Sequence, residues 1–300
     1  MDTFATPGDT KLVVYNPIGA IDVIAEDAGT TTVELIPRGT DGDSVAAETT
    51  VTCAEVGGVS VVTVTFPNPR SFSWRRSGVD VQVRAPEGVD VTVSTAGADR
   101  TIMSLARNTG GEVRLRGKVG DVDVSLPSAD VSAQVVDGSL SIKTASGDVD
   151  AGTVNGAVKV RSVSGDVEIQ ETNEDASLTL VSGDVTIATA NHHVDITSVS
   201  GDVTVADAHD GASVKSTSGD VTVRRMWRGS LRAATVSGDV TVGIPPGRGI
   251  SVDARSMSGE LSSEIDLSSG GGDGEPGGDL VRITAHSVSG DVEIQRAGAS

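Results

Sequence analysis

Apolar residues recur along this chain in pairs two residues apart, and the pairs return every nine residues. Counted from Ser146 as position one, an eighteen-residue unit has apolar residues at positions four, six, nine, thirteen, fifteen and eighteen: Val149, Ala151, Val154, Val158, Val160 and Val163. The units that begin at Ser128 and Ser182 follow the same pattern. Such alternation predicts short β-strands with one buried face, and the Val and Thr residues that fill them favour the pleated conformation. We expect strands and tight turns from about residue 88 to about residue 295.

The tetrapeptide Ser-Gly-Asp-Val marks the start of successive units. Its glycines are spaced by eighteen residues and then more loosely: Gly147, Gly165, Gly183, Gly201, Gly219, and then Gly238, Gly259 and Gly290. Parallel coils favour identical residues at equivalent positions, because each side chain then packs on the same kind of side chain in the next coil, about 4.8 Å away. The alternative, an antiparallel meander of nine-residue hairpins, does not need it. The spacing therefore favours an all-β fold, a parallel β-solenoid (β-helix) whose eighteen-residue coils consist of two nine-residue halves.

The first 87 residues are rich in strand-like runs but lack the strict repeat. Residues 16–23, which read NPIGAIDV, resemble a half-repeat. We therefore expect residues 1–87 to be either a degenerate start of the solenoid or a β-rich cap, and either would cover an open end of the stack. The repeat domain is expected over residues 88–296, with a glycine-rich loop at 268–279 and a tail at 297–300.

Charge and cysteine content narrow the function classes. A net charge of −19 and a pI near 4.4 argue against binding to nucleic acid or to anionic lipid. Cys53 is the one cysteine, which excludes an intramolecular disulfide. We find neither a signal-peptide pattern at the start nor an apolar run of the ~20 residues that a membrane span needs. These features predict a cytoplasmic location, with surface association as the alternative.

Basic residues cluster at a few places in this acidic chain. We interpret them as counter-charges on an exposed face and not as a ligand track. The clusters are Arg75 and Arg76; Arg114, Arg116 and Lys118; and Arg224, Arg225 and Arg228.

Position three of the unit carries an aspartate in consecutive coils, so that stacking would align a ladder of carboxylates. Like charges at this spacing repel by about 1 kcal/mol per pair in water, and something must offset that repulsion. One interpretation is local, with each carboxylate accepting hydrogen bonds from backbone N–H groups and a nearby serine. The other is a Ca²⁺ ladder, for which oxygen ligands are suited. The candidate residues are Asp148, Asp166, Asp184, Asp202, Asp220 and Asp239.

A second candidate cluster lies at the opposite corner, at positions ten to twelve of three successive coils. Stacking would bring His192, His193 and His209 near carboxylates, a ligand set that suits a transition metal. The alternative is a polar, solvated turn. Nearby, Met226 occupies a core position, whereas Trp227 is either an exposed anchor for a partner or the filler of an irregular coil.

Three segments together resemble a bacterial adhesin-type family of β-strand repeats, the domain of unknown function 4097. They are the Ser-Gly-Asp-Val rungs from Ser146 to Val292, residues 16–23, and GVDVTVSTAG at residues 88–97. The resemblance covers most of the chain and implies a parallel β-helix with a surface-binding role. It implies no catalytic residues.

Three functions fit these observations. The first is a non-enzymatic module that presents a regular face to a protein or glycan partner. The second is a scaffold that self-associates through its solenoid ends into a homo-oligomer. The third is a carbohydrate-active β-helix enzyme, which would need clustered acids and stacking aromatics in a groove. Trp and Tyr are scarce in this chain, and we therefore expect no enzyme and no obligatory cofactor.

Overall fold

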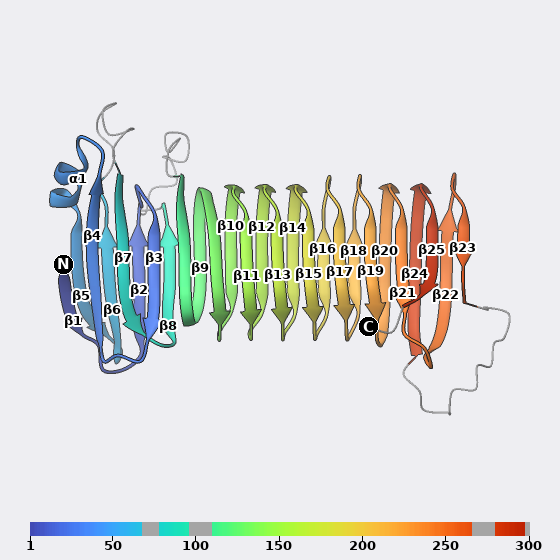
Figure 1. Cartoon of the computed structure of the whole chain (residues 1–300), viewed down its shortest axis with the longest axis horizontal. Helices are drawn as coiled ribbons and strands as arrows, with labels where there is room; N and C mark the ends of the chain where they lie inside the picture. The colour runs from blue at the N-terminus through green and yellow to red at the C-terminus, as the bar shows by residue number, and fades with distance from the viewer. Residues whose placement is uncertain (68–77, 96–109, 266–279, 298–300) are drawn as a thin grey trace. The chain divides into compact units, whose positions relative to one another are not determined.

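The computed structural model describes residues 1–67, 78–95, 110–265 and 280–297. Within these ranges the chain is almost entirely β-structure and forms a parallel β-solenoid, as the repeat predicted (Figure 1). It divides into two compact units, Met1–Gly156 and Ala157–Ser300. Arg75 and Arg76, the glycine-rich stretch 268–279 and residues 298–300 lie outside the described residues. Among the described residues, no helix has the length and hydropathy that a membrane crossing needs.

Unit 1 combines parallel coils with antiparallel additions. Its elements are β1 (Asp2–Ala5), β2 (Thr10–Tyr15), β3 (Ile21–Glu26), β4 (Thr30–Arg38), α1 (Gly42–Glu48), β5 (Thr50–Val56), β6 (Val59–Thr65), β7 (Gly78–Pro86), β8 (Val89–Ser94), β9 (Gly110–Val136), β10 (Leu140–Ser146) and β11 (Val149–Val154).

Strands β2 and β3 belong to the parallel stack although they precede the strict repeat. β2 pairs in parallel with β6 on one side and β8 on the other, and β3 pairs likewise with β7 and β9. In contrast, β1–β4, β4–β7 and β5–β6 pair antiparallel, and α1 lies against β4 and β7. Strands β2 and β3 thus continue the parallel stack, whereas β1, β4 and β5 add to it through antiparallel pairs.

Unit 2 contains the regular repeat. Its strands are β12 (Val158–Ser164), β13 (Val167–Thr172), β14 (Ala176–Ser182), β15 (Val185–Ala190), β16 (Val194–Thr197), β17 (Val203–Ala208), β18 (Ala212–Lys215), β19 (Val221–Met226), β20 (Gly229–Ser237), β21 (Val240–Ile244), β22 (Gly249–Ser256), β23 (Leu261–Ser263), β24 (Leu280–Ser289) and β25 (Val292–Arg296).

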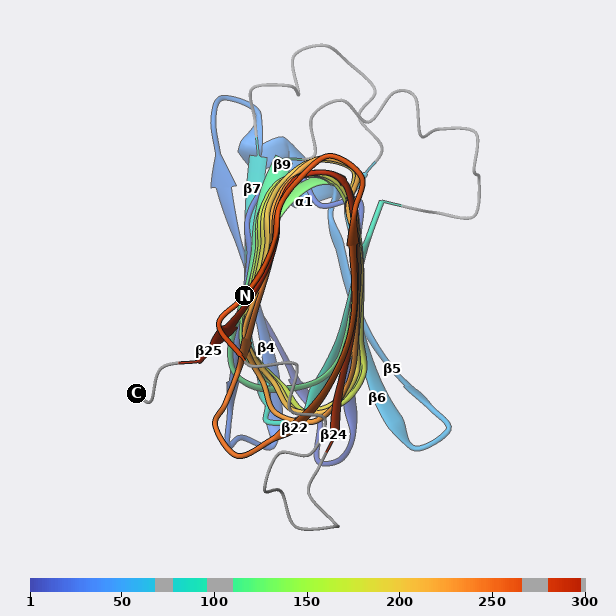
Figure 2. The ribbon, with the colours of Figure 1, turned by 90° about the vertical axis from the view of Figure 1, so that its right-hand side faces the viewer.

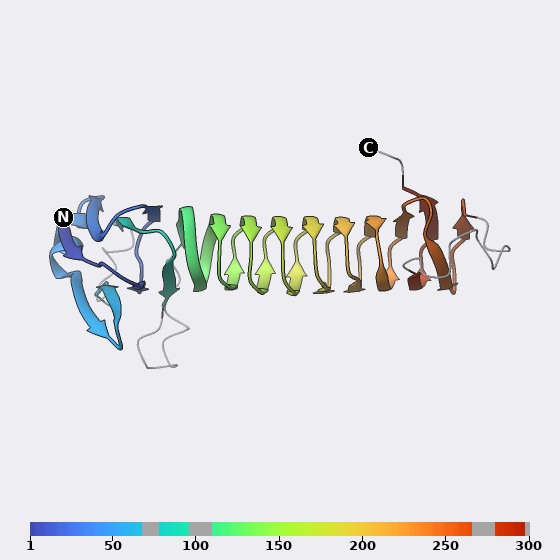
Figure 3. The ribbon, with the colours of Figure 1, turned by 90° about the horizontal axis from the view of Figure 1, so that it is seen from below.

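Each coil of unit 2 contributes one strand to each of two flanks, and these strands form successive rungs (Figure 3). Strands β12, β14, β16, β18 and β20 pair in parallel along one flank, and β13, β15, β17, β19 and β21 along the other. Val185 lies opposite Val203, and Ile187 opposite Val205, so residues eighteen apart stack as predicted. The antiparallel meander is excluded for these strands.

The order of the rungs inverts near the C-terminus. β24 pairs with both β20 and β22, and β25 pairs with both β21 and β23. The last two strands of the chain therefore insert between the coil that ends with β21 and the coil of β22 and β23 (Figure 1). β24 and β25 lie on opposite flanks, as in every other coil of the unit (Figure 2).

The repeated glycine is required at the corner that precedes each strand of the second flank. Gly219 has φ +132°, and a Cβ atom built there would lie 2.2 Å from the carbonyl oxygen of Gly201 in the preceding coil. Gly201 has the same relationship to Gly183. A side chain would be both strained and obstructed at this corner, which explains why the motif recurs.

The apolar residue at position eighteen of the unit lies outside the core. Val163 and Val199 are 49% and 45% exposed, whereas Ser162 and Ser198 at position seventeen are buried. Strict alternation from position thirteen places positions thirteen, fifteen and seventeen inward and position eighteen outward. The buried serine hydroxyls donate to backbone carbonyls two residues later, over 3.0 Å for Ser162 and 3.2 Å for Ser198.

The outermost coil of unit 2 is less well covered than the internal coils. Ile250, Val252 and Ala254 of β22 are half-buried, whereas their partners in β24, Val281 and Ile283 among them, are 0% exposed. β22 has no strand partner other than β24 within the described ranges.

Candidate functional site

Position ten of the repeat forms a column of polar and aromatic side chains along unit 2. Its members are Asn173, Asn191, His209 and Trp227, one from each of four successive coils. Their backbones are held in register, because the N–H of each of the last three donates to the carbonyl of the position-nine residue one coil earlier, over 2.8–2.9 Å. The sequence therefore places chemically different groups on one regular support.

The column begins as an asparagine ladder and ends in an aromatic stack. Asn191 Nδ2 donates to Asn173 Oδ1 over 2.6 Å and to Glu171 Oε1 over 3.2 Å. In the next two coils, the rings of His209 and Trp227 stack with their centroids 5.6 Å apart and their planes 4° apart. The parallel orientation follows from the stacking of successive coils, which aligns equivalent side chains.

The corner that carries Trp227 is one residue longer than the corner of the preceding coil. Ala208 lies opposite Met226, a separation of eighteen residues, but Ala212 lies opposite Leu231, a separation of nineteen. Four residues, Trp227 to Ser230, thus lie between Met226 and Leu231, where three residues lie between the equivalent positions one coil earlier. At this corner Trp227 is half-buried and Arg228 is exposed, while Met226 stays in the core at 0% exposure.

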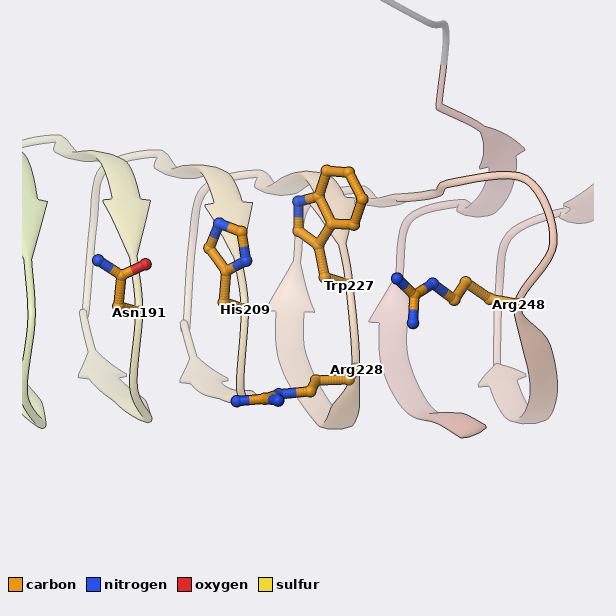
Figure 4. A pocket seen from close by; sticks show the side chains of 5 residues that line it. All are labelled: Asn191, His209, Trp227, Arg228 and Arg248. Atoms are coloured by element: carbon orange, nitrogen blue, oxygen red, sulfur yellow. The ribbon is translucent and has the colours of Figure 1, made fainter. Parts of the chain in front are cut away.

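Arg248 reaches this corner because of the inverted rung order. The chain leaves β21 through Pro245–Gly247 and passes the level of the inserted β24–β25 coil before it enters β22. The Arg248 guanidinium carbon lies 5.8 Å from the centre of the Trp227 ring. His209 and Arg248 lie on opposite sides of Trp227 (Figure 4). The indole is therefore held between an imidazole and a cation.

A carboxylate fixes the edge of the indole. Trp227 Nε1 donates to Asp207 Oδ1 over 3.0 Å, and Arg225 Nη2 donates to Asp207 Oδ2 over 2.5 Å. Burial by itself would raise the pKa of Asp207, but the hydrogen bonds from Arg225 and Trp227 and the charge of Arg225 outweigh it. The pKa of Asp207 therefore lies below its ordinary value of 3.8, and Asp207 stays ionised at neutral pH.

These side chains line an open pocket of about 370 Å³, formed by Asn191, His209, Trp227, Arg228 and Arg248 (Figure 4). No carboxylate belongs to this lining, and two of its five residues are arginines. Arg228 Nε is 3.6 Å from Asp210 Oδ1, an ion pair whose two side chains are about half exposed. The pocket thus combines a fixed aromatic wall, guanidinium donors and an amide.

The aspartate ladder of unit 2 is stabilised by backbone N–H groups of neighbouring coils. Asp166 Oδ1 accepts from the N–H of Asp184 over 2.8 Å, and the same contact joins Asp184 to Asp202 and Asp202 to Asp220. It continues to Asp239 and on to the inserted coil. In unit 1, Asp148 N–H donates to Asp130 Oδ1 over 3.1 Å. The predicted backbone donor is present, but it comes from the adjacent coil and not from the same corner.

The three histidines do not share one column. His209 stacks on Trp227, whereas His193 lies beside Gly211, where an added Cβ would be 3.2 Å from His193 Nδ1. His192 is exposed. In the part of the chain that the structure describes, no three His, Cys, Asp or Glu residues form a group that could hold a metal ion. The metal assignments for the histidines and for the aspartate ladder stay predictions.

The described basic clusters are paired with carboxylates, as the interpretation of counter-charges expects. Arg116 Nε lies 3.4 Å from Asp22 Oδ1, and Lys118 Nζ lies 3.4 Å from Asp137 Oδ2. Arg114 contacts Glu112. In the third cluster, Arg225 contacts Asp207 and Arg228 contacts Asp210, and Arg228 also lines the pocket.

The family model Toastrack DUF4097 matches residues 9–295. The chain belongs to the Toastrack family. This confirms the resemblance that the Ser-Gly-Asp-Val rungs indicated. No curated protein matches the Toastrack chain.

Several solved structures are similar to this Toastrack chain over nearly their whole length. A candidate cell-adhesion protein from Clostridium sporogenes is 8% identical, with 98% of each chain covered and a TM-score of 0.23. A candidate adhesin from Bacteroides fragilis is 10% identical, with 98% and 95% covered and a TM-score of 0.38. A candidate lipid-binding protein from Parabacteroides distasonis is 8% identical, with 97% and 95% covered and a TM-score of 0.42. At these values the likeness carries no information about what the Toastrack chain binds.

Sequence reasoning missed Asn191 as part of a pocket and missed Arg248 altogether. One signal was available, because the glycine spacing changes from eighteen to nineteen between Gly219 and Gly238, and Trp227 lies in that interval. An additional residue at an otherwise invariant corner of a Toastrack repeat indicates a projecting loop. Arg248 also lies in an irregular interval, between Gly238 and Gly259, but its position beside Trp227 depends on the inverted rung order.

Proposed function

We propose that this Toastrack chain is a non-enzymatic binding module that recognises an anionic group of its partner in the pocket of unit 2. The observation that supports the proposal is the fixed Trp227 ring with Arg228 and Arg248 beside it in a lining without carboxylates. In a chain of net charge −19, this pocket brings two guanidinium groups together, of which Arg228 is paired with Asp210. The regular coils supply a rigid support for it.

The titratable groups near the pocket favour binding over catalysis. A general acid needs a raised pKa, which burial or a like charge supplies. Asp207 has a lowered pKa, and both of its oxygens are engaged by Arg225 and Trp227. Its role is to orient the indole and to hold the arginine side chain, and it has no proton to donate at neutral pH.

Tryptophan fluorescence tests the proposal directly. The chain has one other tryptophan, Trp74, so a Trp74→Phe background makes the emission report on Trp227. We would titrate this protein with a glutamate tripeptide, trigalacturonate and inorganic phosphate. A saturable response to at least one probe that is lost in Arg248→Gln supports the proposal. Arg161→Gln, an exposed arginine on β12, is the matched control. No response to any of the three probes would overturn the proposal.

A second candidate function is self-association through the outermost coil of unit 2. Half-buried Ile250 and Val252 on a strand with a free edge among the described residues favour it. Light scattering after size-exclusion chromatography over a range of concentrations tests it. Oligomers that disappear in Val252→Lys, with an unchanged circular dichroism spectrum, support this function, and a monomer at every concentration contradicts it.

A further inference from the structure

Five exposed valines form a continuous stripe along one edge of a flank of unit 2. They occupy position eighteen, or its equivalent in the longer coils, on the rungs of β12, β14, β16, β20 and β24, and Thr217 occupies it on the rung of β18. The serines that follow pair in parallel from rung to rung, which keeps the stripe in register. Single exposed valines are common, but a contiguous row is typical of an interaction surface. The valines are Val163, Val181, Val199, Val236 and Val288, which are 44–50% exposed.

The strands on one side of the stripe carry a surplus of positive charge. Five of their basic residues are exposed, and none of the five forms an ion pair with a residue that the structure describes. Asp195 is the one acidic residue in these six strands. In a chain of net charge −19, these cations are therefore available to an anionic partner. They are Lys159, Arg161, Lys215, Arg232 and Arg282.

The aspartate ladder lies on the other side of the stripe. In each regular coil the carboxylate comes three residues after position eighteen, beyond the serine and the glycine. Asp184, Asp202 and Asp220 are exposed, and each accepts a backbone N–H through Oδ1. Within the described ranges these three carboxylates form no ion pair, so their negative charge is unbalanced. The surface thus runs from cations through valines to carboxylates.

We infer that this surface of unit 2 binds the same surface of a second copy of the chain, with the two solenoids side by side and parallel. A two-fold axis that runs along the stripe places valine on valine and exchanges the two sides, so the cations of each copy face the aspartates of the other. Both copies have rungs ~4.8 Å apart, and the contact therefore repeats from rung to rung. An apolar centre with charged margins is the general composition of protein interfaces.

Charge selects this arrangement over its alternatives. A two-fold axis across the stripe would make the solenoids antiparallel and would place cations opposite cations, which repel each other. An anionic lipid surface would meet the aspartate ladder as well as the cations, and the ladder would repel it. With the axis along the stripe, each rung faces the same rung of the second copy. Val199 then contacts Val199 of the second copy, and Lys215 lies opposite Asp220 of the second copy.

The size of the surface predicts a weak dimer. Six rungs ~4.8 Å apart, and the five residues at ~3.3 Å each that separate position sixteen from position three of the next unit, give roughly 450 Å² on each copy. The total of about 900 Å² is below the ~1,200 Å² at which stable specific interfaces begin. We therefore expect a dissociation constant on the order of 100 μM.

Sedimentation velocity from about 10 μM to about 500 μM, a range that brackets a weak dimer, tests this inference. Val199→Lys should weaken the dimer at least tenfold. Thr186→Lys, an exposed residue of β15 on the other flank, adds the same charge and should change nothing. Lys215→Glu and Asp220→Lys should each weaken the dimer at least tenfold, because the altered contact occurs twice in a two-fold dimer. An equimolar mixture of these two variants should recover dimerisation, since every altered charge then faces its opposite. Thermal unfolding checks that each variant is folded.

Each other result would overturn the inference. A monomer at every concentration, or a dimer that is unchanged in Val199→Lys, would remove the stripe as the contact. A dimer that is lost in Val252→Lys alone would belong to the outermost coil. No recovery in the mixture would exclude the parallel two-fold arrangement. Flotation with vesicles of phosphatidylglycerol and phosphatidylcholine, lost in Val199→Lys, would assign the stripe to a lipid surface. The stripe shares no residue with the pocket, so none of these results bears on the proposed binding of an anion.

Discussion

His209 and Trp227 are separated by eighteen residues in the chain, yet their rings stack with planes only 4° apart. An aromatic pair of this kind contributes about 0.5–1.5 kcal/mol beyond the area that it buries. We therefore expect His209→Ala to lower the free energy of unfolding, measured in urea, by about 1 kcal/mol. It should also shift the Trp227 emission. His192→Ala, an exposed histidine one coil earlier, is the control and should change neither quantity. Equal effects of the two variants would contradict a stabilising stack.

The lowered pKa of Asp207 makes its contribution to the free energy of unfolding depend on pH. Its folded-state pKa lies below 3.8, so its contribution is complete above pH 3.8 and is lost as the pH falls through the lower, folded-state value. Asp207→Asn should cost about 2 kcal/mol at pH 7, because two hydrogen bonds to a charged acceptor are weakened. The difference from the parent protein should shrink below pH 3.8. Urea unfolding over a series of pH values measures it, and a difference that grows toward acid pH would show the sign to be wrong.

Gly219 and Gly247 differ in the space around them although both have positive φ. A Cβ at Gly219 would lie 2.2 Å from a backbone oxygen, whereas nothing lies within 4 Å at Gly247. Positive φ by itself costs a non-glycine residue about 1 kcal/mol. We expect Gly247→Ala to lose about that amount and Gly219→Ala to lose at least ~3 kcal/mol, because the adjacent coil must move. Thermal unfolding followed by circular dichroism compares them. Equal losses would mean that φ, and not the close approach of coils, selects glycine.

Asp202 tests the role of the aspartate ladder. Its Oδ1 accepts the N–H of Asp220 over 2.9 Å, and its own N–H donates to Asp184 Oδ1. Asp202→Ala removes the acceptor and should cost about 1 kcal/mol, reduced from the usual value for a charged acceptor because the site is exposed. Asp202→Asn retains an oxygen and removes a repulsive charge, and we expect it to be within about 0.5 kcal/mol of the parent. Urea unfolding distinguishes the two. A greater loss in Asp202→Asn would contradict the backbone contact as the reason for the ladder.

The calcium hypothesis for the same ladder makes a separate prediction. Bound Ca²⁺ would raise the unfolding temperature by several degrees, and a chelator would reverse the rise. Asp202→Asn should abolish this response. An unfolding temperature that is independent of calcium and chelator would contradict the hypothesis and leave the backbone N–H groups as the partners of the carboxylates.

Much of the fold could be predicted from local pattern. The alternation of Val158 and Val160 with polar neighbours specifies strands, and the eighteen-residue return of Gly147 and Gly165 specifies stacked parallel coils. Hydrophobicity does not decide burial where it disagrees with the alternation of side chains along a strand. Val163 is apolar but lies on the outer face, because it follows the buried Ser162. Its exposure is decided by alternation along the strand and not by the hydrophobicity of its side chain.

The candidate site was only partly accessible to the same reasoning. The repeat by itself determined that Asn191, His209 and Trp227 occupy one column, because equal spacing in a parallel stack means superposition in space. The tertiary structure alone decided that Arg248 joins them, since β24 and β25 insert ahead of β22 and so lead the connection from β21 past Trp227. Periodicity specifies how neighbouring coils align. It holds no information about which coil becomes the neighbour, because long-range pairing depends on the fit of whole strands and not on their distance along the chain.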